Sequence, residues 1–231
     1  MSTFKTEVLK GLKRELPKLG NRKKAIGAQA YMKDIAPFLG VMTPERRSLV
    51  KSLLASLPVP SSDEIAETVR SLWKLDEREY QYAGNDLLAK YNMQLDKKFL
   101  AEHCEYLIST KSWWDTVDGL GSAVVSPLTM KYPAISLMRK WNKSDDIWLV
   151  RASIQHQRGR KYETDVDLLF ELCEPHVAKK EFFIAKGLGW ALRSYSYVDP
   201  KAVKKFIKDH PELTPLAKRE AMKAINRKSA S

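Results

Sequence analysis

Apolar residues recur along this chain at the spacing of one face of an α-helix. In the first segment Leu12, Leu16 and Leu19 follow one another at intervals of three or four residues. The alternation of apolar and polar residues that is typical of half-buried strands is missing, and so are Asn-Gly turns. The pattern therefore predicts an all-α fold.

The helical pattern repeats with a period of 34 or 35 residues, which is typical of stacked helical pairs. Six equivalent marker positions define the period, namely Arg46, Tyr80, Trp114, Trp148, Phe183 and Lys218. We therefore predict an α/α solenoid of about six helical repeats. Residues 1–225 are expected to form a single domain, and residues 226–231, which have no apolar face, a frayed basic tail.

Polar residues and prolines mark the expected helix starts. Asn21 opens a segment that continues toward Pro37, and Thr43 with Pro44 supplies a cap and a first-turn proline for the next helix. Asp96 precedes a helix that is expected to run through Ile108. Similar starts are predicted at or after Ser62, Asp76, Ser112 and Asp145.

One copy of the repeat differs from the others at the slot four residues beyond the marker. Five copies have a small or apolar residue there: Val50, Gly84, Ala152, Gly187 and Met222. The third copy has Asp118. Small and apolar residues suit a closely packed face, and an unpaired buried charge is costly. Asp118 is therefore the first candidate for a functional residue.

Three further residues are expected to surround Asp118. Trp114 lies four residues earlier, so the two side chains share one helix face. Trp190 occupies a slot that is not aromatic in the other copies, and Arg151 lies just beyond its marker. If consecutive repeats align, two aromatic walls, one acid and one cation converge. Such a set suits an anionic polymer that contains a positively charged reacting unit.

Composition narrows the choice of partner. The net charge of +12 and the pI near 9.5 favour a polyanion, such as nucleic acid or a membrane surface. No apolar run approaches the roughly 18 residues of a membrane span, and no secretion signal is evident, so a cytoplasmic location is expected. Cys104 and Cys173 are expected to be reduced core residues, and neither cysteine nor histidine spacing indicates a metal site.

Several segments resemble the DNA alkylation repair family of alkylpurine DNA glycosylases, the AlkD type built from HEAT-like repeats. The most specific segments are KSWWDTVD at residues 111–118 and GWALR at residues 189–193. The others span nearly the whole chain, at residues 30–33, 38–40, 43–47, 147–149, 180–184 and 215–221. The resemblance implies a curved superhelix of about six HEAT-like repeats with a basic concave face.

The same resemblance implies hydrolysis of the N-glycosidic bond of cationic N3- and N7-alkylated purines in duplex DNA. The family is known to leave the lesion in the helix rather than flip it into a pocket, and it needs no cofactor. By the family pattern, Asp118 stabilises the emerging sugar cation and orients the attacking water, while Trp114 and Trp190 flank the sugar.

DNA-binding roles also follow from the family pattern. Arg151 is expected to contact the backbone beside the lesion, and Tyr31 to line the cleft. Phosphate-facing roles are expected for Thr43, Arg47, Lys111, Ser112, Arg193, Lys218 and Arg219. The protein is expected to act as a monomer on double-stranded DNA that contains alkylated purines.

Other interpretations of these residues stay open. Tryptophans on amphipathic helices usually belong to the core, as expected for Trp73, Trp141 and Trp148. Asp115 is expected to be a first-turn acid that the helix dipole favours. A non-catalytic helical-repeat scaffold that holds DNA, RNA or a protein would show the same repeat and the same charge.

Overall fold

The computed structural model describes residues 3–229, and within that range it contains helices and no strand. The chain forms two compact units, the first ending at Leu128 and the second beginning at Thr129, inside helix α9 (Ser126–Lys131). All six marker positions of the repeat lie in helices, one in each of α3, α5, α8, α11, α13 and α15. The prediction of an all-α, α/α helical-repeat fold is confirmed.

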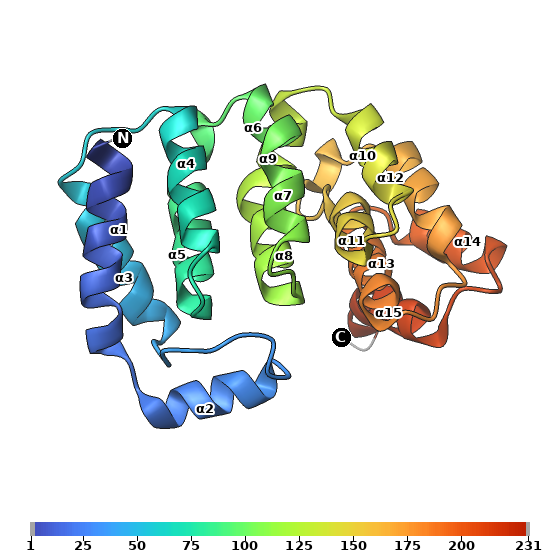
Figure 1. The fold of residues 1–231 in the computed structure, drawn as a ribbon. Helices are drawn as coiled ribbons and strands as arrows, with labels where there is room; N and C mark the ends of the chain where they lie inside the picture. Colours follow the sequence, from blue (N-terminus) through green and yellow to red (C-terminus); the bar gives the residue numbers. More distant parts are fainter. Residues whose placement is uncertain (1–2, 230–231) are drawn as a thin grey trace. The chain divides into compact units, whose positions relative to one another are not determined.

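Before α9, the described part of the first unit contains five helices of 10–13 residues and three of six or seven. In chain order they are α1 (Thr3–Glu15), α2 (Arg22–Tyr31), α3 (Thr43–Ala55), α4 (Ser62–Trp73), α5 (Arg78–Lys90), α6 (Lys97–Glu102), α7 (Cys104–Ser109) and α8 (Trp114–Leu120). Short 3₁₀ turns lie at Pro17–Leu19 and Asn92–Gln94, and α8 continues into a π-helical turn at Gly121–Val125. Helix α4 packs against α1 and α5, and α5 packs against α3 and α8 (Figure 1).

Helix starts in the first unit agree with the predictions to within a residue or two. Asn21 and Asp96 cap α2 and α6 through their side chains, as predicted. Thr43 is the first residue of α3 rather than its cap, which is Met42. The helix expected from Asp96 through Ile108 is interrupted at His103, because φ there is −112°, outside the usual helical range.

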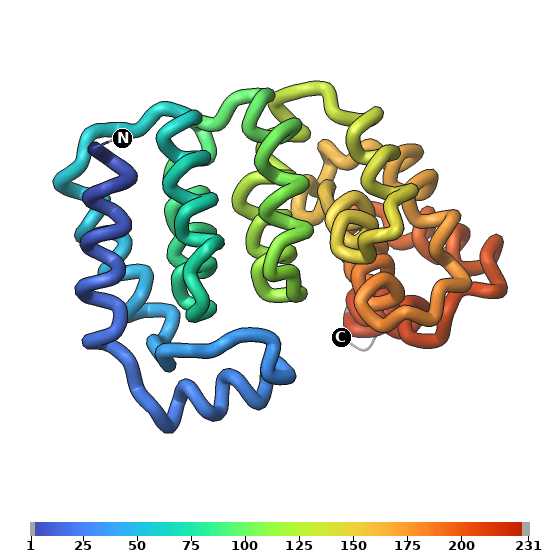
Figure 2. Tube along the Cα trace, viewed as in Figure 1, coloured from blue at the N-terminus to red at the C-terminus, as the bar shows by residue number. Residues whose placement is uncertain are grey.

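Helix α2 differs from the other long helices because none of its residues from Arg22 to Tyr31 is buried. It runs crosswise to α1, and the segment after it turns back toward α3 (Figures 1 and 2). This returning segment is fixed by the buried carboxylate of Glu79 on α5, which accepts hydrogen bonds from the backbone N–H groups of Leu39 (3.0 Å), Gly40 (2.8 Å) and Val41 (3.1 Å). Gly40 has a φ of +80°, and a Cβ there would lie 2.2 Å from the Asn21 carbonyl oxygen.

The second unit consists of three helical pairs. They are α10 (Ile135–Asn142) with α11 (Ile147–Gln155), α12 (Val166–Cys173) with α13 (Phe182–Ser196), and α14 (Pro200–Asp209) with α15 (Pro215–Ser229). Short 3₁₀ turns lie at Lys161–Glu163 and Glu174–His176. Helix α13 packs against α11, α14 and α15, and the core among them includes Leu188, Leu192, Val203 and Ala217.

Helix α15 continues through Ser229, so the first part of the predicted tail at 226–231 is helical, and Ala230 and Ser231 lie outside the described residues. Trp73 and Trp141 are fully buried, as predicted, whereas Trp148 is half-buried against Phe183. Cys104 and Cys173 are buried, free thiols. Among residues 3–229, no helix is long and apolar enough to cross a lipid bilayer.

Candidate functional site

Trp114 and Asp118 lie one turn apart on the same face of α8, and both are half-buried. The Trp114 indole contacts the ring of Tyr31 edge to face, with 6.3 Å between the ring centroids and 84° between the planes. Tyr31 ends α2 and is 71% exposed. The first unit thus brings together two predicted site residues from distant parts of the sequence and places Asp118 one turn further along the same helix.

The start of α8 is held by a buried ion pair between Asp115 and Arg78. The Arg78 guanidinium donates to the two carboxylate oxygens of Asp115 at 2.6 and 3.0 Å, and the Tyr82 hydroxyl donates to the same carboxylate at 2.5 Å. Arg78 also donates to the Lys111 carbonyl oxygen at 2.6 Å. Asp115 is a first-turn acid of α8, as predicted, but its partner Arg78 was not anticipated.

A glycine lets α8 approach α5 closely beside Asp118. A Cβ at Gly119 would lie 2.4 Å from Nδ2 of Asn85, a side chain that donates to the Thr116 carbonyl oxygen. A larger residue at 119 would therefore displace the Asn85 side chain and disturb its hydrogen bond to the Thr116 carbonyl oxygen. Packing does not explain why position 121 is a glycine, because a Cβ there would meet no described atom within 4 Å.

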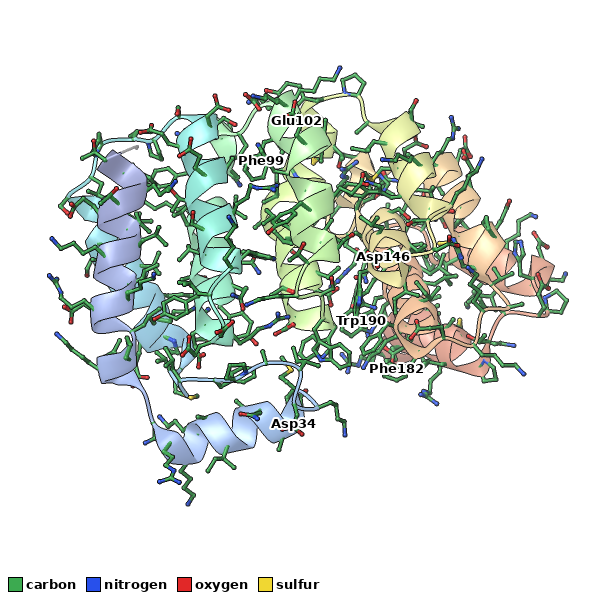
Figure 3. The ribbon with its side chains drawn as sticks, in the orientation of Figure 1. Asp34, Phe99, Glu102, Asp146, Phe182 and Trp190 are labelled. Atoms are coloured by element: carbon green, nitrogen blue, oxygen red, sulfur yellow. The ribbon has the colours of Figure 1, made fainter. Side chains whose placement is uncertain are left out.

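In the second unit, the half-buried Trp190 lies on α13 (Figure 3). Four cationic side chains lie around its indole. The charged groups of Arg158, Lys186, Arg151 and Arg193 lie 5.0, 5.4, 5.5 and 5.6 Å from the indole. Each is within the range of a cation–π contact. The positive charges of these four side chains therefore gather around the indole, and such an arrangement suits an anion such as a phosphate.

The predicted cation Arg151 belongs to this cluster but is only 1% exposed. It donates to the Phe183 carbonyl oxygen at 2.5 Å, and a Cβ at Gly187 would lie 3.0 Å from its NH1 atom. Gly187 thus leaves the space in which the Arg151 side chain packs between α11 and α13. The contact between Arg151 and the DNA backbone stays a prediction.

Glu220 on α15 is a part of the second unit that the sequence did not single out. It is 5% exposed, and its carboxylate accepts hydrogen bonds from Trp190 Nε1 (3.1 Å), Arg193 NH1 (3.1 Å) and Lys223 Nζ (2.5 Å). Burial acts to raise the pKa of Glu220, but the hydrogen bonds from Lys223 and Trp190 outweigh it and leave the pKa lowered. Glu220 is therefore an ionised group that binds the indole directly.

The remaining predicted DNA-binding residues fall into two groups. Lys111 and Ser112 stabilise the turn before α8, since Lys111 Nζ donates to the Leu75 carbonyl oxygen at 2.5 Å and Ser112 Oγ to the Ile108 carbonyl oxygen at 2.5 Å. Arg47 is exposed and pairs with Asp86 at 3.2 Å. The other exposed members are Thr43, Lys218 and Arg219.

Trp114 and Asp118 belong to the first unit, and Trp190 and Arg151 belong to the second. The predicted convergence of these four residues therefore stays a prediction. Within the described residues, no group of histidine, cysteine, aspartate and glutamate side chains has an arrangement that would hold a metal ion.

His156 follows the last residue of α11 and lies in the wall of a cavity of about 530 Å³ that also includes Tyr132 and Arg160. Burial lowers the pKa of His156 from 6.5 to about 4, and one ring nitrogen lies 2.6 Å from the Ser153 carbonyl oxygen. The histidine is therefore neutral at pH 7, as a core residue would be.

We expect acid to destabilise the fold through His156. The unfolded chain binds a proton on this residue near pH 6.5 and the folded chain only near pH 4, so its contribution is complete above pH 6.5 and is lost as the pH falls toward 4. The free energy of unfolding therefore falls by about 3 kcal/mol over this range through His156. Urea unfolding of the protein and of His156→Asn between pH 4 and 7 measures it. Equal pH dependence of the two proteins would contradict the expectation.

Comparisons with known proteins agree with the fold and with the motifs. The family model described as DNA alkylation repair enzyme matches residues 12–225. A solved structure described as a predicted DNA alkylation repair enzyme from Enterococcus faecalis is similar, with a TM-score of 0.80 and 29% sequence identity, over 88% of this chain and 95% of that chain. Comparison with curated proteins gives no match. The chain belongs to the DNA alkylation repair enzyme family.

Proposed function

We propose that this protein is a DNA glycosylase that hydrolyses the N-glycosidic bond of cationic N3- and N7-alkylated purines in duplex DNA. The observation that carries the proposal is the pairing of a half-buried indole with a carboxylate one turn away, Trp114 and Asp118 on α8. Membership of the DNA alkylation repair enzyme family supports a damaged-DNA substrate.

The chemistry of the substrate explains why the protein needs few catalytic groups to cleave the glycosidic bond. An N3- or N7-alkylated purine carries a positive charge, so the base departs as a neutral molecule when the electron pair of the C1′–N9 bond moves to N9. Positive charge then develops on the deoxyribose as an oxocarbenium-like centre. Water adds to C1′ and loses a proton, which leaves an abasic site and the free base.

Asp118 acts on the developing charge in this proposal. A carboxylate fixed on a helix stabilises an adjacent cation more in the transition state than in the ground state, because the positive charge moves toward it during bond cleavage. The same oxygen atoms orient the attacking water. Half-burial favours this role, since electrostatic attraction is stronger where less water screens it.

The two indoles provide the walls that hold the sugar. Trp114 is steadied by its contact with Tyr31 and by the Asp115–Arg78 pair at the start of α8. Trp190 is steadied by Glu220 and by the cations around it. The proposal requires both indoles to address the same nucleotide, and an aromatic face attracts a cationic sugar by roughly 0.5–2 kcal/mol.

Phosphate contacts are proposed for the exposed basic residues and for the cations around Trp190. Lys and Arg side chains bind the DNA backbone independently of sequence, so selectivity for the lesion comes from the lability of its glycosidic bond. The exposed Arg47, Lys218 and Arg219 are the simplest members of this set, together with the hydroxyl of Thr43. We propose that the protein acts as a monomer and needs no cofactor.

Base release from methylated duplex DNA tests the proposal. We expect the purified protein, with a metal chelator present, to release N7-methylguanine or N3-methyladenine well above the spontaneous rate, as measured by chromatography of the free bases. Unmethylated duplex is the control and should yield no base. If the protein binds the duplex but releases no base above the spontaneous rate, the proposed enzyme activity is wrong and a non-catalytic helical-repeat scaffold is supported.

A further inference from the structure

Glu220 lies where α15 packs closely against α13. A Cβ at Gly189 would lie 2.6 Å from the Glu220 Cβ and 2.7 Å from the Ala217 carbonyl oxygen. The absence of a side chain at 189 therefore allows the two backbones to approach each other. Since Trp190 follows Gly189 directly, this approach brings its indole within hydrogen-bonding distance of the Glu220 carboxylate at 3.1 Å.

The carboxylate links the indole to the cations around it. One oxygen, Oε2, accepts from both Trp190 Nε1 and Arg193 NH1, and Oε1 accepts from Lys223 Nζ. The guanidinium of Arg193 also lies 5.6 Å from the Trp190 ring. One buried anion therefore fixes the rotation of the indole and the position of a cation beside it.

Burying the Glu220 carboxylate costs free energy, and the need to fill space between the helices does not explain why a charged residue lies there. A buried carboxylate loses its hydration, and an apolar residue would fill the same space without that loss. A hydrogen bond from an indole N–H to a charged acceptor is stronger and more directional than one to a neutral acceptor. The directional hydrogen bond restricts the orientation of a side chain that stays half-exposed.

We propose that Glu220 is a positioning residue that holds the Trp190 indole and the Arg193 guanidinium in a fixed arrangement for the lesion. The inference rests on the proposed glycosylase function, in which Trp190 flanks the deoxyribose. Glu220 does not contact DNA in this proposal. It acts only through the side chains of Trp190 and Arg193, two of the three side chains that it binds.

Glu220→Gln tests the proposal with little change in shape. We expect the single-turnover rate constant for release of N7-methylguanine at saturating protein to fall roughly 10- to 100-fold, because misplaced groups lose catalytic power steeply. Affinity for undamaged duplex should stay the same or rise, because the substitution removes a negative charge beside Arg193 and Lys223. Glu212→Gln on the exposed surface removes the same charge and should leave the rate unchanged.

A double-mutant cycle separates positioning from a merely structural role. In a Trp190→Phe background, which lacks the indole N–H, Glu220→Gln should slow release by a smaller factor than in the unmodified protein, because only the contact with Arg193 is then left to weaken. An equal slowing in both backgrounds would overturn the proposal. So would a parallel loss of rate and duplex affinity, because that outcome indicates damage to the fold rather than misplacement of the indole.

A spectroscopic measurement tests the positioning without any activity. The six tryptophans give indole N–H signals in a ¹⁵N-labelled sample, and Trp190→Phe identifies the signal of Trp190. We expect that signal to be protected from hydrogen exchange in the unmodified protein, to lose part of its protection in Glu220→Gln, where the acceptor is neutral, and to lose protection fully in Glu220→Leu. Unchanged protection in the Leu variant would overturn the proposal, whereas absence of base release by the unmodified protein would overturn only the proposed function.

Discussion

Asp118→Asn is expected to slow the release of N7-methylguanine by about 100- to 1000-fold, the range for removal of one group that stabilises transition-state charge. Asparagine keeps the size of the side chain but carries no charge, so it loses the attraction to the sugar cation. Because the positive charge of the sugar develops only as the bond breaks, affinity for duplex DNA should not fall. Single-turnover kinetics and duplex titration measure the two quantities separately.

Asp167→Asn is a matched control for this substitution, since Asp167 is an exposed acid in the first turn of α12. It should change neither the rate of release nor the affinity. If Asp118→Asn reduces rate and affinity by the same factor, or lowers the free energy of unfolding by several kcal/mol, then Asp118 is a structural acid and the proposed role is wrong.

The helical repeat was predictable because it depends on local patterns. Apolar spacing and capping residues act over a few residues, and Asn21 and Asp96 cap helices as expected. The interruption at His103 was not predictable from these patterns. The apolar spacing continues across it, and only the backbone dihedral angles of the folded chain reveal the break.

The shared face of Trp114 and Asp118 was also predictable, because four residues make one helical turn. The groups that hold the candidate site were not. Arg78 binds Asp115 from another helix, and Glu220 binds Trp190 in the same way. Such pairs depend on which side chains face each other after the helices pack, and spacing along one helix does not contain that information.

The burial of Arg151 illustrates the same limit. The position of Arg151 in the repeat predicted a cation on the helix face that meets the ligand. Its guanidinium does lie 5.5 Å from the Trp190 ring. The length of an arginine side chain allows its charged end to turn inward, and here the guanidinium donates to the Phe183 carbonyl oxygen inside the fold. The position of an arginine along a helix therefore does not fix the position of its charge.

Two adjacent residues at the start of α5 explain how Tyr31 meets Trp114. The Arg78 side chain holds the beginning of α8 through Asp115, and Glu79 holds the segment after α2 through three backbone N–H groups. The backbone N–H of Arg78 also donates to the Pro37 carbonyl oxygen at 2.9 Å. Because α2 buries no residue between Arg22 and Tyr31, these polar contacts, together with the buried Met32 that follows it, position Tyr31.

Arg78→Met is therefore expected to lower the free energy of unfolding by about 3–5 kcal/mol, the usual cost of removing one partner from a buried ion pair. Arg78 is 0% exposed, and its loss leaves the Asp115 carboxylate with the Tyr82 hydroxyl but without a cation. Chemical denaturation at neutral pH measures the change. The indole N–H signal of Trp114 in a ¹⁵N-labelled sample of the folded variant, identified with Trp114→Phe, reports whether the start of α8 has moved.

Arg139→Met is the matched control, because Arg139 forms a similar two-pronged pair with Glu171 at 2.6 and 2.7 Å on the exposed surface. Its loss should cost about 1 kcal/mol or less, since water screens exposed pairs. Adding Asp115→Asn to Arg78→Met should restore part of the lost stability, because the uncompensated charge is then removed. If Arg78→Met costs no more than Arg139→Met, the Asp115–Arg78 pair does not hold α8, and the position of Trp114 depends on the packing of α8 against α5 and α7 and on the contact with Tyr31.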